Sequence, residues 1–241
     1  MQENGRIGLI GAMDEEIASL LEKMDQVETQ KVYHTTYYTG IIKDTPVVVC
    51  KSGVGKVNGA ICTQILIDRF HVEAVIFTGV AGALHPDLDI GDLVISTECQ
   101  QHDLDASALG FPKGTIPFQE TSVFPADPQL IRWAVKAGET LEGVRVRLGK
   151  VLSGDQFISD INKGAELREQ LNGDCVEMEG AAVAHVCHLS GIPYVVIRSM
   201  SDRADHSADV NFAEFTKLAA ERSSALVTKI LEQRTQEKER R

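Results

Sequence analysis

"RIGLIGAMDEEIASLLEKM", residues 6–24, contains the change of hydrophobic period on which the fold depends. Residues 6–12 are a short apolar run ending in glycine and alanine, which predicts a buried strand. Residues 14–24 carry apolar side chains at helical spacing, namely Ile17, Leu20, Leu21 and Met24. The N-terminal segment therefore predicts a strand followed directly by a helix.

The same alternation continues along the chain. We expect further strands within residues 31–53, where a KDTP turn separates two of them, and at 74–84, 91–97, 145–154 and 193–202. Helices are expected at 56–70, 165–171, 180–191 and 212–233. Such alternation predicts an α/β fold in which a mixed or parallel sheet is covered by helices. No internal repeat or linker interrupts it, so we expect one domain over residues 1–241, with 233–241 as a frayed tail.

Residues 101–128 are expected to form a long loop, because they hold several prolines and show little hydrophobic period. Long loops in compact domains are usually functional or disordered. The apolar residues of this loop argue against simple disorder and indicate an interface: Leu109, Phe111, Ile116 and Phe118.

The composition is that of an ordinary globular protein, with 43% hydrophobic and 24% charged residues. The net charge of −11 disfavours nucleic acid as a partner, since nucleic acids are polyanions. No apolar run is long enough to cross a bilayer, and the N-terminus lacks the basic start and cleavage site of a signal peptide. The five cysteines contain no CxxC pair and indicate free thiols in a reducing compartment. We therefore expect a cytoplasmic protein without membrane or nucleic-acid partners.

Three short motifs invite a cofactor or metal interpretation that their residues do not support. SGVGKVNG, residues 52–59, departs from both the phosphate-loop and the dinucleotide-binding spacing, which favours a glycine-rich turn between strand and helix. HVCH, residues 185–188, lacks an evident third metal ligand, and HDLD, residues 102–105, is better explained as a capped loop. We expect no metal and no cofactor.

Carboxylates gather where the predicted strands end. In α/β sheets, ligands bind beyond the carboxyl ends of the strands. GAMDEE follows the first strand and RSMSD ends the last, which places Glu16 and Asp202 at that edge. VEMEG, residues 176–180, adds Glu177 and Glu179 just before a buried apolar run. Spacing alone leaves open whether Glu16 is solvated in the first helical turn or points into a site.

Six segments occur in an order that resembles one known family: IGLIGAMDEE, KSGVGKVNGA, TGVAGAL…GDLVIS, SGDQFI, VEMEGAAVAHVC and VVIRSMSD. The resemblance covers roughly residues 5 to 232 and is to the 5′-methylthioadenosine/S-adenosylhomocysteine nucleosidases of the nucleoside phosphorylase superfamily. VEMEG is shared by many members of that superfamily, whereas the pairing of GAMDEE with RSMSD is typical of the nucleosidase branch. The resemblance implies a single-domain, three-layer α/β/α fold with a central mixed β-sheet flanked by helices, assembled as a homodimer.

The resemblance also implies the reaction, which is hydrolysis of the N-glycosidic bond of 5′-methylthioadenosine, S-adenosylhomocysteine and 5′-deoxyadenosine in methionine salvage. Glu16 would activate the attacking water, and Asp202 would donate a proton to purine N7. The implied substrate-binding residues are Met13, Val54, Val80, Ala81, Gly82, Phe157, Ile158, Glu177, Met178, Glu179, Arg198, Ser201 and Phe212. The implied pocket for the 5′-thio substituent is closed by Leu109 and Pro117 of the partner subunit.

The resemblance gives individual roles to the residues around the sugar and the base. Glu179 would bind the ribose hydroxyls, with Met178 packed against the sugar. Glu177 would support Glu179 or contact the 2′-hydroxyl, and it shares a face with Glu179 if this segment is extended. Phe157 would stack on adenine, while the main chain of Ile158 would bind the edge of the base.

Two further roles and one departure concern the acid and the water. Ser201 would support Asp202, and Arg198 would help to hold Glu16 and its water. Val80 stands where many members of the family have serine, which removes one hydroxyl from the water or ribose side.

Three alternatives stay open from the residues alone. A phosphate-dependent purine nucleoside phosphorylase has the same fold but needs a phosphate site built from arginines and glycine amides. An aminodeoxyfutalosine nucleosidase would share every residue named above. A non-catalytic nucleoside-binding module is disfavoured by the intact set of Glu16, Glu179 and Asp202.

Overall fold

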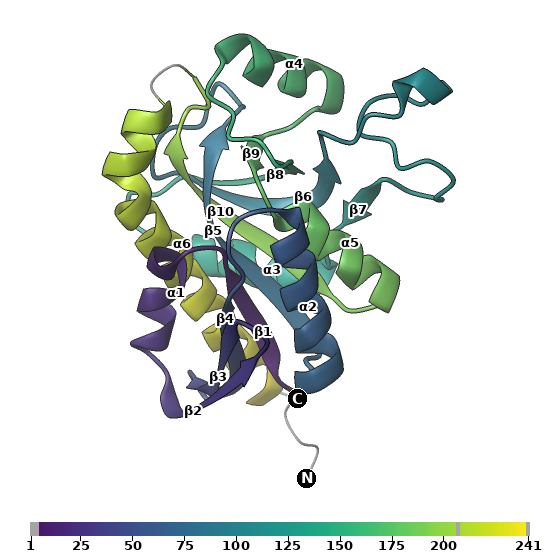
Figure 1. The fold of residues 1–241 in the computed structure, drawn as a ribbon. Coiled ribbons are helices and arrows are strands. Elements are labelled where there is room, and N and C mark those ends of the chain that lie inside the picture. The colour runs from purple at the N-terminus through teal and green to yellow at the C-terminus, as the bar shows by residue number, and fades with distance from the viewer. Residues whose placement is uncertain (1–4, 206–207, 240–241) are drawn as a thin grey trace.

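The computed structural model describes residues 5–205 and 208–239, and Figure 1 shows their course. The strands are β1 (Ile7–Gly11), β2 (Asp25–Val32), β3 (Thr35–Ile42), β4 (Thr45–Lys51), β5 (Ala74–Ala83), β6 (Leu93–Gln101), β7 (Val123–Pro125), β8 (Val146–Ser153), β9 (Cys175–Glu177) and β10 (Tyr194–Asp202). The helices are α1 (Asp14–Leu21), α2 (Lys56–Phe70), α3 (Pro128–Gly138), α4 (Ile161–Leu171), α5 (Gly180–Ser190) and α6 (Ala208–Glu239), with a short 3-10 turn η1 (Ser107–Leu109).

In the described part of the chain, the strands form a single sheet of ten strands that closes on itself over part of its width. Strand β10 pairs in parallel with β5 and antiparallel with β6. From β6 the pairing continues through β8 and β9 and returns to β5. These five strands form a ring, and β1, β4, β3 and β2 extend from β5 as an open wing.

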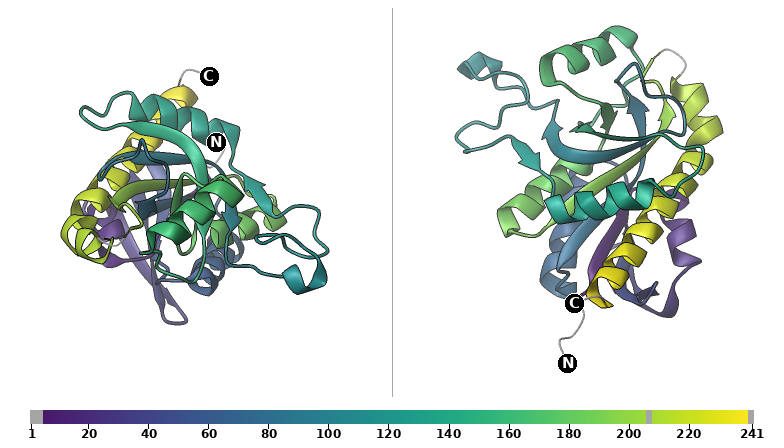
Figure 2. Two further views of the ribbon diagram at one scale, coloured as in Figure 1. Left: turned by 90° about the horizontal axis from the view of Figure 1, so that it is seen from above. Right: turned by 180° about the vertical axis from the view of Figure 1, so that it is seen from behind.

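Helices cover both faces of this sheet, as Figures 1 and 2 show. Helices α1 and α3 pack on α6, and α6 packs on β5 and β10. Helices α2 and α5 pack on each other and cover the other face, while α4 lies at one end of the molecule. The predicted α/β/α arrangement around a mixed sheet is therefore confirmed. No helix within the described ranges is long and apolar enough to span a membrane.

Strands β5 and β10 form the buried centre that carries the candidate site. Every residue of both strands is buried, as expected for neighbouring parallel strands covered on two faces. Each valine or isoleucine buried there stabilises the fold by roughly 1.5–3 kcal/mol. The register between the two strands shifts between Met200 and Asp202. Such bulges re-aim side chains and are frequent beside active sites.

Several elements were not predicted from the sequence, among them β2, α3 and β9. Strand β2 was largely missed because its residues are almost all exposed and polar, so no apolar alternation marks it. Helix α3 was missed although Asp127 and Pro128 form a start signal, with the Asp127 carboxylate accepting two amides of the first turn. The expected loop 101–128 contains the short elements η1 and β7.

The expectation of a frayed tail over residues 233–241 is wrong for its described part. Helix α6 continues to Glu239, and residues 240–241 lie outside the described residues. Arg234 within this stretch is buried, pairs with Glu73 and donates to the carbonyl of Gly5 at 3.1 Å. These contacts fix this part of α6 against the residues that precede β1 and β5.

Candidate active site

The carboxyl ends of β1, β5, β9 and β10 surround a cavity of about 290 Å³. Pockets for small organic ligands typically measure roughly 300–1,000 Å³, so the volume suits a small ligand. The predicted site residues that line it are Met13, Glu16, Val54, Val80, Ala81, Gly82, Phe157, Ile158, Glu177, Met178, Glu179, Ser201, Asp202 and Phe212. The lining also includes Ala12, Gln156 and Val176, which we did not predict although each directly adjoins a predicted residue.

Glu16 points from the first turn of α1 into this cavity. Its Oε2 accepts hydrogen bonds from the amides of Ala12 (2.6 Å) and Met13 (3.0 Å), and its Oε1 accepts from the amide of Val80 (2.9 Å). Burial raises the pKa of the Glu16 carboxyl, while the charge of Arg198 and the three amides act in the opposite direction. Residue spacing left open whether Glu16 is solvated or points into a site, and the structure shows that it faces the cavity and not the solvent.

Asp202 lies beyond the bulge at the end of β10. The Ser201 hydroxyl donates to its Oδ2 at 2.9 Å, and the amide of Ala204 donates to its Oδ1 at 2.8 Å. Burial raises the pKa of the Asp202 carboxyl despite these two hydrogen bonds. A carboxyl group with a raised pKa can carry a proton near neutral pH and act as a general acid.

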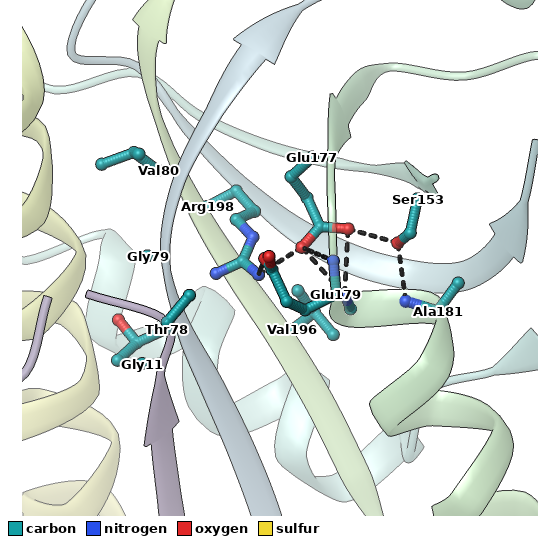
Figure 3. A network of polar contacts seen from close by, with 12 residues as sticks. Gly11, Thr78, Gly79, Val80, Ser153, Glu177, Glu179, Ala181, Val196 and Arg198 are labelled. Atoms are coloured by element: carbon teal, nitrogen blue, oxygen red, sulfur yellow. Dashed lines mark hydrogen bonds and ion pairs between the residues drawn. The ribbon is translucent and has the colours of Figure 1, made fainter. Parts of the chain in front are cut away.

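Glu177, the last residue of β9, is held from several sides (Figure 3). Its carboxylate accepts the amides of Glu179 (3.2 Å) and Gly180 (2.8 and 3.0 Å) at the start of α5. It also accepts hydrogen bonds from the Ser153 hydroxyl and the Arg198 guanidinium. Ser153 was not predicted, because its contact with Glu177 joins two strands that are distant in the sequence.

Glu179 reaches the cavity as the N-cap residue of α5. Because β9 already ends at Glu177, the two carboxylates do not share one face of an extended strand. The Glu179 Oε1 accepts the amide of Gly55 at 2.7 Å, and its Oε2 lies 4.0 Å from Arg198 Nη2. Burial and then repulsion from Glu177 raise the pKa of Glu179 to about 8, against the attraction of Arg198.

Arg198 lies behind the cavity wall and is only 1% exposed. Its guanidinium carbon is 3.9 Å from the centre of the Phe77 ring, and its Nη2 donates to Glu177. Among the described residues, its Nη1 and Nε have no hydrogen-bond partner. Arg198 and Glu16 approach each other across Gly79, where a Cβ atom would overlap Glu16 Oε1 and lie 2.5 Å from Arg198 Nη1. Arg198 therefore acts on Glu16 through its charge, while its direct hydrogen bond goes to Glu177.

One wall of the cavity is apolar. Met13, Val80 and Phe212 pack together, and the rings of Phe157 and Phe212 make an edge-to-face contact at 5.6 Å. Val54 adds a further apolar side chain that is half exposed. This wall suits an apolar part of a ligand, while the carboxylates of the cavity suit its polar part.

Leu109 and Pro117 do not line the cavity. They belong to a segment that projects from the body of the molecule, visible in teal in Figures 1 and 2. Leu109 is 70% exposed and Phe118 is 91% exposed, and Phe118 contacts Phe111 edge-on at 5.6 Å. The segment thus presents apolar side chains away from its own cavity.

The motifs HVCH and SGVGKVNG, which did not support a metal or cofactor site in the sequence, make other contacts in the structure. Across the described residues, no group of three or more His, Cys, Asp or Glu side chains could hold a metal ion. The His185 ring stacks on Phe124 at 4.5 Å, with His188 at 5.3 Å from the same ring. The glycine-rich turn before α2 presents the amide of Gly55 to a carboxylate.

Comparisons with known proteins show the family of this chain. A family model described as "Phosphorylase superfamily" matches residues 6–232. The chain is 42% identical over 229 residues to the 5′-methylthioadenosine/S-adenosylhomocysteine nucleosidase of Bacillus cereus (strain G9842), which covers 95% of this chain and 99% of the relative.

Two solved structures are similar over almost the whole chain. The 5′-methylthioadenosine/S-adenosylhomocysteine nucleosidase of Neisseria meningitidis, in complex with methylthio-immucillin-A, has a TM-score of 0.91 and 39% identity, covering 95% of this chain and 99% of that one. The futalosine hydrolase of Helicobacter pylori strain 26695 has a TM-score of 0.91 and 33% identity, covering 96% and 99%. This chain therefore belongs to the phosphorylase superfamily and, within it, to the 5′-methylthioadenosine/S-adenosylhomocysteine nucleosidase family.

Proposed function

We propose that this enzyme hydrolyses the N-glycosidic bond of 5′-methylthioadenosine and S-adenosylhomocysteine, and also of 5′-deoxyadenosine, releasing adenine and the ribose product. The charge of the cavity carries this proposal. Among the described residues, its lining contains four carboxyl groups and no cation, the four being Glu16, Glu177, Glu179 and Asp202. Such a lining offers no cation to bind a phosphate nucleophile, whereas a carboxylate can activate water. A phosphorylase is disfavoured for the same reason.

The departing purine requires a proton. As the glycosidic bond breaks, positive charge develops on the sugar and negative charge moves into the base, by analogy with glycoside hydrolysis. Asp202 would donate its proton to purine N7, and Ser201 and the amide of Ala204 would then stabilise the carboxylate. The raised pKa of Asp202 supports this role, because the acid must be protonated when the substrate binds. Proton transfer of this kind contributes roughly 10²–10⁴-fold to the rate.

The attacking water would be activated by Glu16. Three main-chain amides hold the Glu16 carboxylate toward the cavity. Across Gly79 from it, the buried Nη1 of Arg198 lacks a partner among the described residues and offers a donor to the same water. Val80 supplies an amide but no hydroxyl here. We infer that the carboxylate and the guanidinium together orient the water.

The ribose hydroxyls would be bound by Glu179, with Met178 packed against the sugar. The Gly55 amide fixes one oxygen of the Glu179 carboxyl, and Glu177 fixes the main chain of Glu179. Hydroxyl donors favour the ionised form of a carboxyl group. Substrate binding would therefore lower the raised pKa of Glu179 and release a proton.

Adenine and the 5′-substituent would occupy the rest of the cavity. Phe157 would stack on the base, and the main chain of Ile158 would bind its edge. The 5′-thio substituent would contact the wall formed by Met13, Val54 and Phe212, since each CH₂ group buried there contributes roughly 0.8 kcal/mol.

The active assembly in this proposal is a homodimer with two-fold symmetry. The projecting segment exposes Leu109 and Phe118, and apolar patches of that kind usually mark an interface. The 5′-thio pocket would be closed by Leu109 and Pro117 of the partner subunit.

We place the enzyme in methionine salvage and in the disposal of S-adenosylmethionine by-products, in the cytoplasm. All five cysteines are free and buried, which suits a reducing compartment.

Aminodeoxyfutalosine is the second candidate substrate, because futalosine hydrolase has the same fold at 33% identity. Adenine release should be compared for 5′-methylthioadenosine, S-adenosylhomocysteine, 5′-deoxyadenosine and aminodeoxyfutalosine at equal concentrations. We expect the thio-nucleosides to have the highest kcat/KM. A higher value for aminodeoxyfutalosine would reassign the substrate, and binding without adenine release from any of them would indicate a non-catalytic module.

A further inference from the structure

We propose that Lys56, Asp103 and Asp155 form a positioning triangle, which fixes the two loops that hold the two halves of the substrate. The ribose turn is defined as residues 53–56 and the purine loop as residues 154–158. The kinetic part of this inference rests on the proposed nucleosidase function, whereas its structural part does not.

The triangle is a closed set of contacts between three segments that are far apart in the sequence. Lys56 Nζ pairs with Asp103 Oδ1 at 2.6 Å. Asp103 Oδ2 accepts the amide of Asp155 at 2.8 Å, and Asp155 Oδ1 accepts the amide of Lys56 at 2.8 Å. Each of the three residues therefore contacts the other two. Lys56 Nζ also donates to Gln101 Oε1 at 3.2 Å, which ties it to the end of β6.

Lys56 and Asp155 each adjoin a residue that forms or supports part of the cavity. Lys56 follows Gly55, whose amide binds the Glu179 carboxyl assigned to the ribose. Asp155 precedes Gln156 and Phe157, which line the cavity on the side assigned to the base. A shift of the triangle would therefore move both substrate contacts relative to each other.

Gly154, the first residue of the purine loop, is closely packed and has little freedom to move. A Cβ atom on Gly154 would overlap the His102 ring and lie 3.0 Å from the carboxyl carbon of Asp103. The Gly154 amide donates to the carbonyl of Glu177 at 3.1 Å. These close contacts fix one side of the loop, and the triangle fixes the other.

The ion pair in the triangle is more protected than an ordinary surface pair. The side chains of Lys56 and Asp103 are 19% and 16% exposed. Although burial opposes it, the contacts with Lys56 and the Asp155 amide lower the pKa of Asp103, so this carboxylate stays ionised at neutral pH. Partial burial reduces screening by solvent, which strengthens the pair relative to exposed pairs.

The first test replaces Lys56→Met and measures two quantities. Kinetics with 5′-methylthioadenosine should show a fall in kcat/KM of roughly 10²-fold, mainly through a higher KM, because both contacts with the substrate are displaced. Hydrogen exchange of the unliganded protein should be faster at the amides of residues 155–158. Lys43→Met is the matched control, since it removes an exposed pair with Glu232 at 2.8 Å and should change neither quantity.

The second test compares Asp155→Asn with Asp155→Ala. Asparagine keeps an acceptor for the Lys56 amide, and the lost charge matters little because Asp155 Oδ2 is 4.0 Å from Lys56 Nζ and its side chain is 51% exposed. Asp155→Asn should therefore retain the wild-type KM, while Asp155→Ala should behave like Lys56→Met. A purely structural role would lower thermal stability without this difference in KM.

The inference is overturned if Lys56→Met and Asp155→Ala both keep the wild-type KM and the wild-type exchange of residues 155–158. If the wild-type protein releases no adenine, the proposed function fails. The hydrogen exchange of residues 155–158 in the variants then tests by itself whether the triangle positions the loop.

Discussion

The Arg198 guanidinium is hydrogen-bonded to Glu177, so the cation behind the cavity is already neutralised by one of the acids around it. Glu16 and Glu179 have no such direct hydrogen bond to Arg198, and burial raises the pKa of both. The cavity therefore holds an excess of carboxyl groups. Where these carboxyl groups ionise on substrate binding, they suit a reaction in which positive charge develops on a bound sugar, because preorganised groups of opposite charge stabilise the transition state.

Replacement of the proposed base or acid should abolish most of the turnover. Glu16→Gln and Asp202→Asn keep the size of the side chains but remove a proton transfer, which contributes roughly 10²–10⁴-fold each. We expect kcat to fall by that order in both variants, measured by adenine release, with unchanged circular dichroism. Near-full turnover in either variant would contradict the role given to that residue.

Gly79→Ala should disturb the water site without unfolding the protein. The added Cβ atom would overlap Glu16 Oε1 and lie 2.5 Å from Arg198 Nη1, so both groups must move. Displacements of this size at a reacting centre cost roughly 10²-fold in rate. Gly8→Ala is the control, because the tightest contact of its Cβ would be with the flexible end of Leu66 at 3.0 Å and its contacts with Val72, at 3.5 Å, are ordinary. Equal kcat values for the two variants would refute the proposed approach of Glu16 and Arg198 over Gly79.

Glu179 should make the free enzyme less stable as the pH rises. Its pKa is raised from 4.5 to about 8 in the folded state, so its contribution to stability is complete below pH 4.5 and is lost as the pH rises through about 8. Glu179→Gln cannot ionise and should show a smaller decline in the free energy of unfolding over this range. Urea denaturation at a series of pH values measures this difference. Parallel curves for wild type and variant would show that the Glu179 pKa is not raised.

Leu109→Asp should weaken both assembly and substrate binding. An exposed leucine that becomes fully buried at an interface contributes roughly 1.5–3 kcal/mol, so we expect KM to rise by about tenfold or more. Sedimentation should show a shift from dimer to monomer. Tyr33→Asp, at another exposed apolar site between β2 and β3, should leave both unchanged. A fully active wild-type monomer at assay concentration would contradict the assembly.

Local patterns in the sequence predicted most of the fold. The helix over residues 56–70 and the strand ending at Asp202 agree with α2 and β10, because apolar spacing marks both directly. The closure of the sheet was not predicted, since the antiparallel pairing of β10 with β6 joins segments about a hundred residues apart and leaves no local pattern. Strand β2 was missed for a related reason, because its exposed residues carry no apolar alternation.

Most residues of the site were predicted from the sequence, whereas several of the contacts between them were not. Family motifs gave Glu16, Glu179 and Asp202, and the ends of the strands bring all three to one cavity. The partner of Arg198 was not predicted, because whether it bonds Glu16 or Glu177 depends on distances across the sheet. Lys56 was given no role, although it lies within KSGVGKVNGA, because its contacts with two other loops appear only in three dimensions.

The central claim, hydrolysis without phosphate, is tested most directly by identifying the sugar product. Purified enzyme should be incubated with 5′-methylthioadenosine in phosphate-free buffer and in buffer with added phosphate, and both products measured. We predict equal rates of adenine release in the two buffers, with free 5-methylthioribose as the sugar. Dependence on phosphate, with 5-methylthioribose 1-phosphate as the main product, would contradict the account.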